Sequence, residues 1–298
     1  MISRPLGVAA IIGASLLWAT TGTAAAQAPA LNAIAVGAGA MGFGGLLQLL
    51  IHLFPLIDAR QRLRQHAGMV TGGALCVAVY PLAFYGSMRL AGVAVGCMVS
   101  IASAPLAAAA IERVVLGRRL TRATRWACAL GIVGAVLISL AGQGDSTDFN
   151  SVELATGVGL GIVAGATYAG YTLVMRTLMI GGISRRAVSG AVLGGGGLIL
   201  LPVFWVAAPA HWDAESVGVI TYLAVLPMFV GYLLFAYGLA RVDATTATTV
   251  TLLEPAAATV LAVLVLGERI SPIGWIGMAA IAGCLLILIA PQLTRRTP

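Results

Sequence analysis

Long apolar runs separated by short polar connections fill almost the whole of this 298-residue sequence. Each run is close to the roughly 20 residues that an α-helix needs to cross the hydrocarbon core of a bilayer. The connections leave no room between the runs for a soluble catalytic or regulatory domain. We therefore predict an all-α polytopic membrane protein with ten transmembrane helices, at residues 5–26, 32–57, 68–88, 92–112, 124–142, 154–175, 187–208, 216–240, 244–267 and 272–291.

The composition also indicates an integral membrane protein. Hydrophobic residues make up 60% of the chain and charged residues only 9%, with a mean hydropathy of +1.00. These values lie far outside the range of soluble globular domains. We expect the lipid bilayer to be the protein's main surrounding partner, and a monomer or weak dimer within it.

The placement of charge predicts the orientation of the chain. All 17 basic residues are arginine, and with the N-terminus inside, all but Arg89 and Arg269 fall on cytoplasmic segments. Cytoplasmic connections carry such an excess of positive charge, so we predict cytoplasmic N- and C-termini in a bacterial inner membrane. The formal charge of +7 then reflects topology. Scattered arginines without interleaved exposed aromatic residues do not predict nucleic-acid binding.

An internal repeat divides the chain into two similar halves. A shift of about 150 residues places matching motifs on one another: Trp18 on Tyr168, Gly42–Leu46 on Gly194–Leu198, Tyr80 on Tyr232, Pro105 on Pro255, and Trp126 on Trp275. We predict repeats at residues 1–142 and 154–298, joined by an extracytoplasmic linker at 143–153. Five crossings are an odd number, so the second repeat would enter the membrane from the other side. Such inverted repeats are typical of secondary transporters.

The end of each repeat carries a resemblance to a known family. Pro255 followed by LAVLVLGERISPIGWIGMAAIAGCLLIL (261–288) resembles the C-terminal signature of the EamA branch of the drug/metabolite transporter superfamily, and 105–139 resembles a weaker copy. One motif differs: Gly267-Glu268-Arg269 corresponds to Gly117-Arg118-Arg119 in the first copy. The resemblance covers nearly the whole chain. It implies two five-helix EamA-like units and a carrier of small metabolites that works by alternating access, most similar within the branch to aromatic amino-acid exporters.

Glu254 is the most informative single residue. It is the only acidic residue near the middle of an apolar run, and Pro255 follows it. Placing an ionisable side chain there costs at least ~2.5 kcal/mol on insertion scales, so such a residue usually faces a cavity or a partner. One interpretation is that Glu254 binds a substrate ammonium group or carries a proton. The other is that a protonated carboxyl group braces the kink between helices.

Pro105 and Pro255 occupy matching positions and predict kinks. Each proline removes a backbone donor and frees a carbonyl four residues earlier, at Ile101 and Thr251. In the lipid bilayer, each such carbonyl group needs a hydrogen-bond donor. The hydroxyl groups of Ser100, Ser103 and Thr251, water, or a substrate are the candidates. A purely structural kink that allows hinge bending is the alternative.

Aromatic residues recur at matching depths in the two repeats. Trp18, Tyr80, Tyr168, Tyr171 and Tyr232 lie deep in their runs. Buried Tyr and Trp side chains each need a hydrogen-bond partner, so they can line a cavity that stacks an apolar group and offers polar tips. Plain helix packing is the alternative. Tyr85 and Tyr237 lie nearer to helix ends, where we expect them to anchor the protein at the membrane interface.

This sequence lacks the residue patterns that several kinds of chemistry require. The four cysteines and three histidines are dispersed and predict no disulfide, metal site or catalytic constellation. We therefore expect no cofactor and no enzymatic activity. No arginine lies in the middle of a run, which disfavours phosphorylated substrates because they need a cation.

The function predicted from these features is a secondary transporter. We expect it to export amino acids, aromatic and other neutral ones, and related small metabolites. The predicted substrate-binding residues are Trp18, Tyr80, Ser100, Ser103, Tyr168, Tyr171, Tyr232, Thr251 and Glu254, with Pro105 and Pro255 at hinges. A carrier of multiple drugs or quaternary cations on the same scaffold is the alternative, with Glu254 as the cation site.

Overall fold

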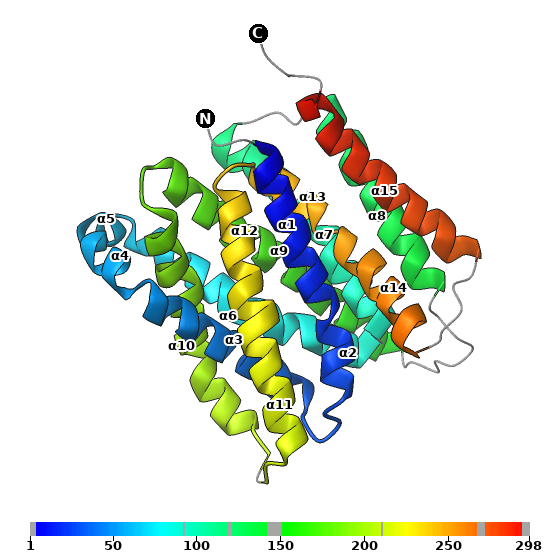
Figure 1. The fold of residues 1–298 in the computed structure, drawn as a ribbon, viewed down its shortest axis with the longest axis horizontal. Coiled ribbons are helices and arrows are strands. Elements are labelled where there is room, and N and C mark those ends of the chain that lie inside the picture. The colour runs from blue at the N-terminus through cyan, green and yellow to red at the C-terminus, as the bar shows by residue number, and fades with distance from the viewer. Residues whose placement is uncertain are drawn as a thin grey trace.

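The computed structural model describes residues 4–91, 93–117, 121–141, 151–209, 211–266 and 272–293. Every regular element within these ranges is a helix, and the helices pack into one bundle (Figure 1). Most of the predicted linker at 143–153 lies outside the described residues. So do the charged residues of the Gly-Arg-Arg and Gly-Glu-Arg motifs, at 118–119 and 268–269.

The apolar runs of the first half form helices interrupted by short turns. In the described part of that half, they are α1 (Arg4–Ala19), α2 (Thr21–Ala26), α3 (Ala33–Ile51), α4 (Leu53–Asp58), α5 (Arg60–Gln65), α6 (Ala67–Ala91), α7 (Val93–Leu116) and α8 (Arg122–Ala141).

The second half is built in the same way, with one π-helical segment. Its described elements are α9 (Ser151–Ile180), α10 (Arg185–Ala207), α11 (Ala214–Leu223), the π-helix η1 (Ala224–Val230), α12 (Gly231–Leu239), α13 (Ala244–Val250), α14 (Leu253–Leu266) and α15 (Pro272–Leu293).

Six segments of the described chain are long and apolar enough to cross a membrane. They coincide with the first, second, third, sixth, seventh and eighth runs predicted from the sequence: Arg4–Ala25, Ala33–Ile51, Ala67–Ala91, Val152–Ile180, Arg185–Ala207 and Ala214–Leu239. The other four runs also contain helices, namely α7, α8, the pair α13 and α14, and α15. The helical content of the runs is thus as predicted.

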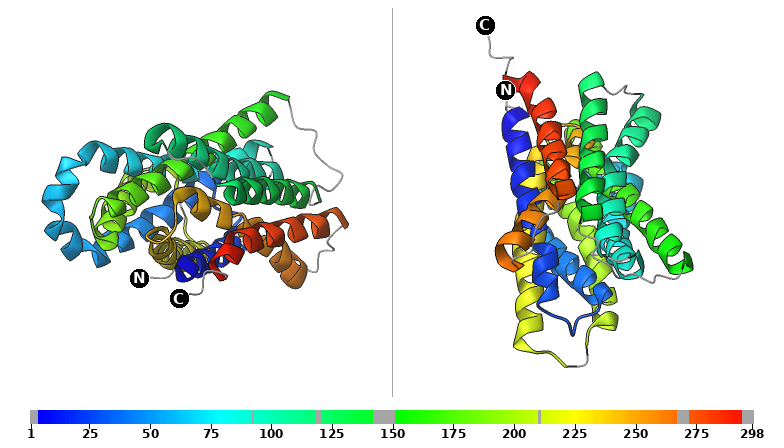
Figure 2. Two further views of the ribbon diagram at one scale, coloured as in Figure 1. Left: turned by 90° about the horizontal axis from the view of Figure 1, so that it is seen from above. Right: turned by 90° about the vertical axis from the view of Figure 1, so that its right-hand side faces the viewer.

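Helices of the first half pack mainly against helices of the second. The pairs with most contacts are α3 with α10, α6 with α9, and α8 with α15, the last of which lie side by side in both views (Figures 1 and 2). At the crossing of α3 and α10, a Cβ atom on Gly45 would lie 2.8 Å from the Cα atom of Gly197. Glycine at both positions allows the two backbones to touch, as small residues do in membrane bundles.

Polar residues at predicted helix boundaries cap the helices. The Asn32 side chain accepts a hydrogen bond from the Ala35 N–H at the start of α3, and the Ser184 hydroxyl oxygen accepts one from the Ala187 N–H at the start of α10. Each cap satisfies a backbone donor that the helix leaves unpaired. Asp213 caps α11 similarly, and hydrogen bonds from Ser216 lower the pKa of its carboxyl group.

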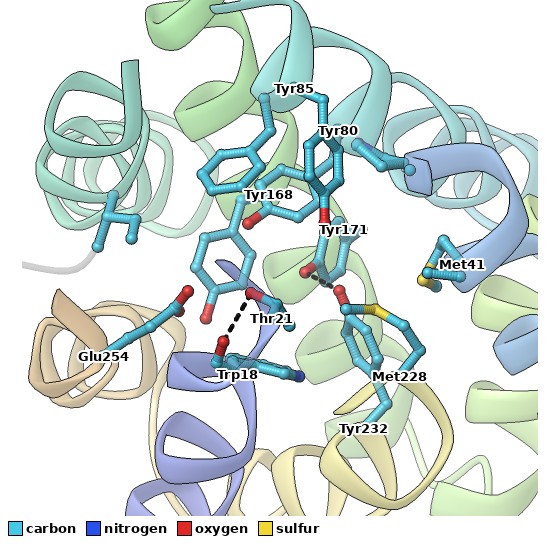
Figure 3. Close-up of a pocket in the computed structure, with 15 residues that line it drawn as sticks. Trp18, Thr21, Met41, Tyr80, Tyr85, Tyr168, Tyr171, Met228, Tyr232 and Glu254 are labelled. Carbon is cyan, nitrogen blue, oxygen red and sulfur yellow. Dashed lines mark hydrogen bonds between the residues drawn. The ribbon is translucent and has the colours of Figure 1, made fainter. Parts of the chain in front are cut away.

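The first predicted helix, 5–26, is divided at Thr20. The Thr20 hydroxyl donates to the Leu17 carbonyl oxygen at 2.7 Å, and the Thr21 hydroxyl donates to the Trp18 carbonyl oxygen at 2.7 Å. Threonine hydroxyl groups that bond back to their own helix often bend it. The break between α1 and α2 directs Thr21 toward the interior of the bundle, as Figure 3 shows.

Pro255 and Pro105 act differently on their helices. α13 ends at Val250 and α14 begins at Leu253, whereas α7 continues through Pro105. The expectation that Pro255 leaves the Thr251 carbonyl group free is wrong, because the Glu254 N–H donates to it at 2.9 Å. The chain interrupts its helix before the proline, so the tight turn satisfies this carbonyl group and no substrate is needed for it.

Candidate functional site

A cavity with about 40 Å³ of space for the centres of water-sized spheres lies in the interior of the bundle. Helices from both halves of the chain line it: α1, α2, α3, α6, α7, α9 and α14, with η1 and α12. Its labelled side chains converge from all sides (Figure 3). The lining residues are Trp18, Thr21, Gly37, Ala40, Met41, Tyr80, Pro81, Phe84, Tyr85, Ile101, Tyr168, Tyr171, Met228, Tyr232 and Glu254.

An aromatic cluster forms most of the cavity wall. The ring centroids of Trp18 and Tyr232 are 5.1 Å apart, and those of Tyr80 and Tyr168 are 5.5 Å apart. These two pairs are related by the internal repeat, which places Trp18 on Tyr168 and Tyr80 on Tyr232. Trp18 and Tyr168 meet edge to face at 6.4 Å, a favourable arrangement for aromatic rings. All five deep aromatic residues singled out in the sequence, including Tyr171, therefore lie at one cavity.

Hydrogen bonds hold several of these rings in place. The Trp18 indole N–H donates to the carbonyl oxygen of Pro227 in η1 at 2.9 Å. The hydroxyl oxygens of Tyr171 and Tyr232 are 2.9 Å apart, and the Tyr168 hydroxyl donates to the Thr251 hydroxyl oxygen at 3.1 Å. Side chains with fixed rings form a preorganised surface, which lowers the entropy cost of binding a ligand.

The π-helix η1 provides the acceptor for the Trp18 indole N–H. Side chains from the first half of the chain donate hydrogen bonds to two of its backbone carbonyl groups. Trp18 binds the Pro227 carbonyl, and the Gln48 amide donates to the Phe229 carbonyl oxygen at 2.9 Å. Short π-helical segments often occur at functional sites. Met228, between the two carbonyl groups, lines the cavity.

Among the described residues that line the cavity, Glu254 is the only one with a carboxyl group. It lies in the first turn of α14, and its carboxylate points toward the space between Trp18 and Tyr168 (Figure 3). Within the described part of the chain, this carboxylate makes no hydrogen bond and no ion pair with the protein. A carboxylate in an apolar interior without a cation favours a positively charged or hydrogen-bond-donating ligand.

The other predicted residues lie outside this cavity. The Ser100 hydroxyl donates to the Gly96 carbonyl oxygen at 2.7 Å, and the Ser103 hydroxyl donates to the Ser100 carbonyl oxygen at 3.3 Å. Ser103 faces α9, where a Cβ atom on Gly165 would collide with its hydroxyl oxygen. Thr251 stands behind the cavity wall and contacts it through Tyr168. Both serine hydroxyl groups therefore donate hydrogen bonds to backbone carbonyl oxygens of α7.

Several cavity residues were not expected from the sequence. Tyr85 was predicted to be an interfacial anchor, and this is wrong because it lines the cavity. Thr21, Met41, Phe84 and Met228 were not singled out at all. The sequence spacing could have predicted one of them. Phe84 follows Tyr80 by four residues, and residues three or four apart lie on the same face of a helix. The methionines are indistinguishable in sequence from ordinary core residues.

A second cavity, of about 280 Å³ on the same measure, extends the first toward one end of the bundle. The two share Trp18, Thr21, Phe84, Tyr85 and Glu254. The second continues along Gln27, Met88, Cys97, Pro255 and Ala258. These residues lead to the end where α2 lies, which is opposite the end where α1 begins (Figure 1). We call the latter the arginine-rich end, after Arg4, Arg176, Arg185 and Arg241.

The model of one protein family matches both halves of the sequence. The EamA-like transporter family is matched over residues 5–140 and again over residues 155–289. The chain belongs to this EamA-like transporter family. The resemblance seen in the sequence is thereby confirmed. With its long apolar helices, this EamA-like transporter is an integral membrane protein.

Two curated relatives align with nearly the full length of the EamA-like transporter. One, from Bacillus subtilis (strain 168), is named "Uncharacterized transporter YwfM" and is 32% identical over 288 residues, covering 95% of this chain and 93% of the relative. The other, from Streptantibioticus cattleyicolor, is named "Probable terminal-alkyne amino-acid exporter" and is 28% identical over 289 residues, covering 91% and 92%. A solved crystal structure with 19% identity shares the fold, with a TM-score of 0.80 over 99% of this chain and 100% of that one.

Proposed function

We propose that this EamA-like transporter exports neutral and aromatic amino acids and related small metabolites. The observation that carries the proposal is an aromatic cavity whose described lining residues include one carboxylate without a described partner, that of Glu254, and no basic residue. An amino acid presents an ammonium group that pairs with a carboxylate. Its apolar side chain stacks on aromatic rings, which offer large contact areas. The relative named as an amino-acid exporter supports the same substrate class.

The carboxylate of an amino acid also needs donors in the cavity. Trp18 and Tyr168 already donate to protein oxygens. The hydroxyl groups of Tyr80 and Tyr85, by contrast, make no hydrogen bond to any described residue, although both side chains line the cavity. Neutral donors are sufficient for a carboxylate whose own ammonium group is bound nearby. We therefore assign Glu254 to the ammonium group and Tyr80 and Tyr85 to the carboxylate.

We further propose that transport occurs by alternating access of two inverted five-helix repeats, 1–142 and 154–298. Under the repeat, α1 corresponds to α9, α6 to α12, and α7 to the pair of α13 and α14. The contacts follow this correspondence: α1 packs on α12 and α14, and α9 packs on α6 and α7. Along the described residues, the connected cavities extend toward the end where α2 lies, as an open state of such a cycle requires. We also propose an inner-membrane location, with the arginine-rich end on the cytoplasmic side as the charge rule favours.

A carrier of lipophilic or quaternary cations is the second candidate. Aromatic rings attract cations through their faces by about 0.5–2 kcal/mol each, and the cluster of Trp18, Tyr80, Tyr168, Tyr171 and Tyr232 surrounds one side of the space that Glu254 faces (Figure 3). A cation without a carboxylate would use Glu254 and leave Tyr80 and Tyr85 without a role.

Flux in proteoliposomes distinguishes the two candidates. Radiolabelled phenylalanine, leucine and alanine, and separately a labelled quaternary ammonium compound, are measured with and without a pH gradient. Saturable amino-acid flux that unlabelled amino acids compete away supports the first proposal. Flux of the ammonium compound alone, with amino-acid flux equal to that of empty liposomes, replaces it with the second. Dependence on the gradient shows whether protons are coupled to transport.

Met228→Ala is expected to shift selectivity toward larger side chains. Met41 and Met228 lie across the cavity from Glu254 (Figure 3), where the side chain of an ammonium-bound amino acid would extend. Shortening Met228 opens space there, and one or two methylene groups of fit change specificity by about 10- to 200-fold. The ratio of tryptophan to leucine uptake should rise at least about 10-fold. Met69→Ala on α6, outside the cavity lining, is the control; an equal ratio in both variants contradicts the assignment.

A further inference from the structure

The turn that joins α12 to α13 is held, together with the start of α13, by side chains from other helices at the arginine-rich end; residues 240–246 are together called this turn. Arg176 of α9 donates from Nη1 to the Ala240 carbonyl oxygen at 2.7 Å. Arg4 of α1 forms an ion pair with Asp243, with 3.5 Å between nitrogen and oxygen. The turn connects α12, which carries Tyr232, to the segment that carries Glu254. Movement of this turn would therefore be transmitted to two sides of the cavity.

Glu112 of α7 makes the most deeply buried contact with this turn. Its side chain is only 4% exposed. One carboxylate oxygen, Oε1, accepts hydrogen bonds from the N–H groups of Ala244 at 3.0 Å and Thr245 at 3.4 Å. The other, Oε2, accepts one from the Thr245 hydroxyl at 2.8 Å. Hydrogen bonds to an ionised group are about twice as strong as neutral ones, so Glu112 is a firm link between the two family-matched halves.

The helices are in close contact beside this turn. A Cβ atom on Gly7 of α1 would lie 2.8 Å from the Cβ atom of Arg241 and 3.2 Å from the carbonyl oxygen of Gly238. No such closure is present along Gln27, Met88 and Cys97, where the cavity continues. In this conformation the described part of the protein is therefore packed shut at the arginine-rich end and hollow toward the other.

The contacts with the turn have no counterpart in the other repeat. A shift of 150 residues places Glu112 on Ala262, Arg176 on Ala26 and Arg4 on Leu154. None of these counterparts has a side chain that can form an ion pair or a hydrogen bond. During alternating access, the contacts of Glu112, Arg176 and Arg4 with this turn would therefore stabilise closure at the arginine-rich end, with no equivalent contacts for closure at the opposite end.

We propose that Glu112 is a positioning residue of the transport cycle, whose bonds to Ala244 and Thr245 hold the arginine-rich end shut while the cavity is open to the opposite end. These bonds break when the cavity opens to the arginine-rich end. The proposal rests on the alternating access of the proposed function, and it is independent of which substrate is carried. Loss of Glu112 shifts the population toward the state open at the arginine-rich end.

The native cysteines provide a test on the full chain. Cys97 lines the second cavity, so its alkylation reports opening at that end. In a Cys76→Ala, Cys128→Ser, Cys284→Ala background, the rate at which a charged maleimide modifies Cys97 is measured in detergent without substrate. Glu112→Ala is expected to slow this reaction at least about threefold, because a shift in population changes the rate in proportion.

A second reporter measures the other end. Thr246 lies in the held segment and is completely buried, and its hydroxyl oxygen has no hydrogen-bond partner among the described residues. Thr246→Cys in a background with all four native cysteines replaced is therefore a conservative change. With Glu112→Ala, alkylation at this position is expected to accelerate at least about threefold as the Cys97 reaction slows.

Controls separate this proposal from loss of fold. Asp58→Ala removes an exposed carboxylate at the end of α4 and should change neither rate. If Glu112→Ala does not give a monodisperse protein, Glu112→Gln and Thr245→Val weaken the same link with less change in shape. Opposite changes at the two reporters support the proposal. Unchanged rates, or acceleration at both, overturn it. A failed amino-acid flux experiment leaves this result standing, because no substrate is present.

Discussion

Glu254→Gln is expected to reduce amino-acid transport in proteoliposomes at least about 30-fold. Glutamine keeps the shape of the side chain and removes the charge, so the ammonium group of a substrate enters an apolar cavity without a counter-ion. Removing one member of a desolvated charge pair costs about 2–5 kcal/mol, and each 1.4 kcal/mol is about a factor of ten in affinity. The effect should appear mainly as a higher KM in saturable flux.

Glu215→Gln is the matched control for this prediction. Glu215 lies in the first turn of α11, as Glu254 lies in the first turn of α14, but its side chain is exposed and remote from the cavity lining. The control should transport like the parent protein. If Glu254→Gln keeps a KM within about twofold of the parent, Glu254 has a structural role only, as a brace for the break before Pro255.

Gly45→Ala is expected to lower the melting temperature of the purified protein by about 2–12 °C. The added Cβ atom would lie 2.6 Å from the Leu193 carbonyl oxygen and 2.8 Å from the Cα atom of Gly197. Both are backbone atoms, so relief requires α3 and α10 to move apart. Overpacking of this kind costs about 1–3 kcal/mol, and each kcal/mol corresponds to about 2–4 °C in a protein of this size class. Thermal unfolding followed by size-exclusion chromatography measures the change.

The same substitution at Gly159 should have the opposite sign. Gly159 lies on α9, and apart from its chain neighbours and the backbone of its own helix, a Cβ atom added to it would have no described atom within 4 Å. Alanine also favours a helix over glycine by about 1 kcal/mol. Gly159→Ala should therefore unfold at the same or a slightly higher temperature. Equal melting temperatures for the two variants would mean that the crossing of α3 and α10 is loosely packed.

The repeat in the sequence was most useful for the aromatic residues. Trp18 and Tyr168 were paired by register alone, as were Tyr80 and Tyr232, and all four meet at the cavity. Helices related by a repeat bring equivalent positions to equivalent places, so residues at matching depth converge near the axis between the halves. Depth was misleading for Tyr85, because distance from a helix end does not tell which way a helix faces.

The serines of α7 illustrate the same limit. Ser100 and Ser103 have the right depth for a central cavity, yet their hydroxyl groups bond to carbonyl groups of their own helix. Rotation of a helix about its axis decides which residues face a cavity. In a bilayer this rotation is poorly marked in the sequence, because the core and the lipid are both apolar and the usual alternation of polar and apolar faces is weak.

The amino-acid sequence alone was sufficient to predict that this protein is a membrane protein, where its helical runs lie, that it contains a repeat, and to which family it belongs. The bilayer imposes a minimum length and a nearly uniform hydrophobicity on each run, and both are properties of local sequence. Packing between distant segments decided which side chains reach the cavity, where α1 and the Glu254 segment break, and that Glu112 bonds to a turn 132 residues away. Such contacts depend on how each helix is rotated about its axis and on which backbone N–H groups remain unpaired at helix ends. Neither property can be read from the residue types alone.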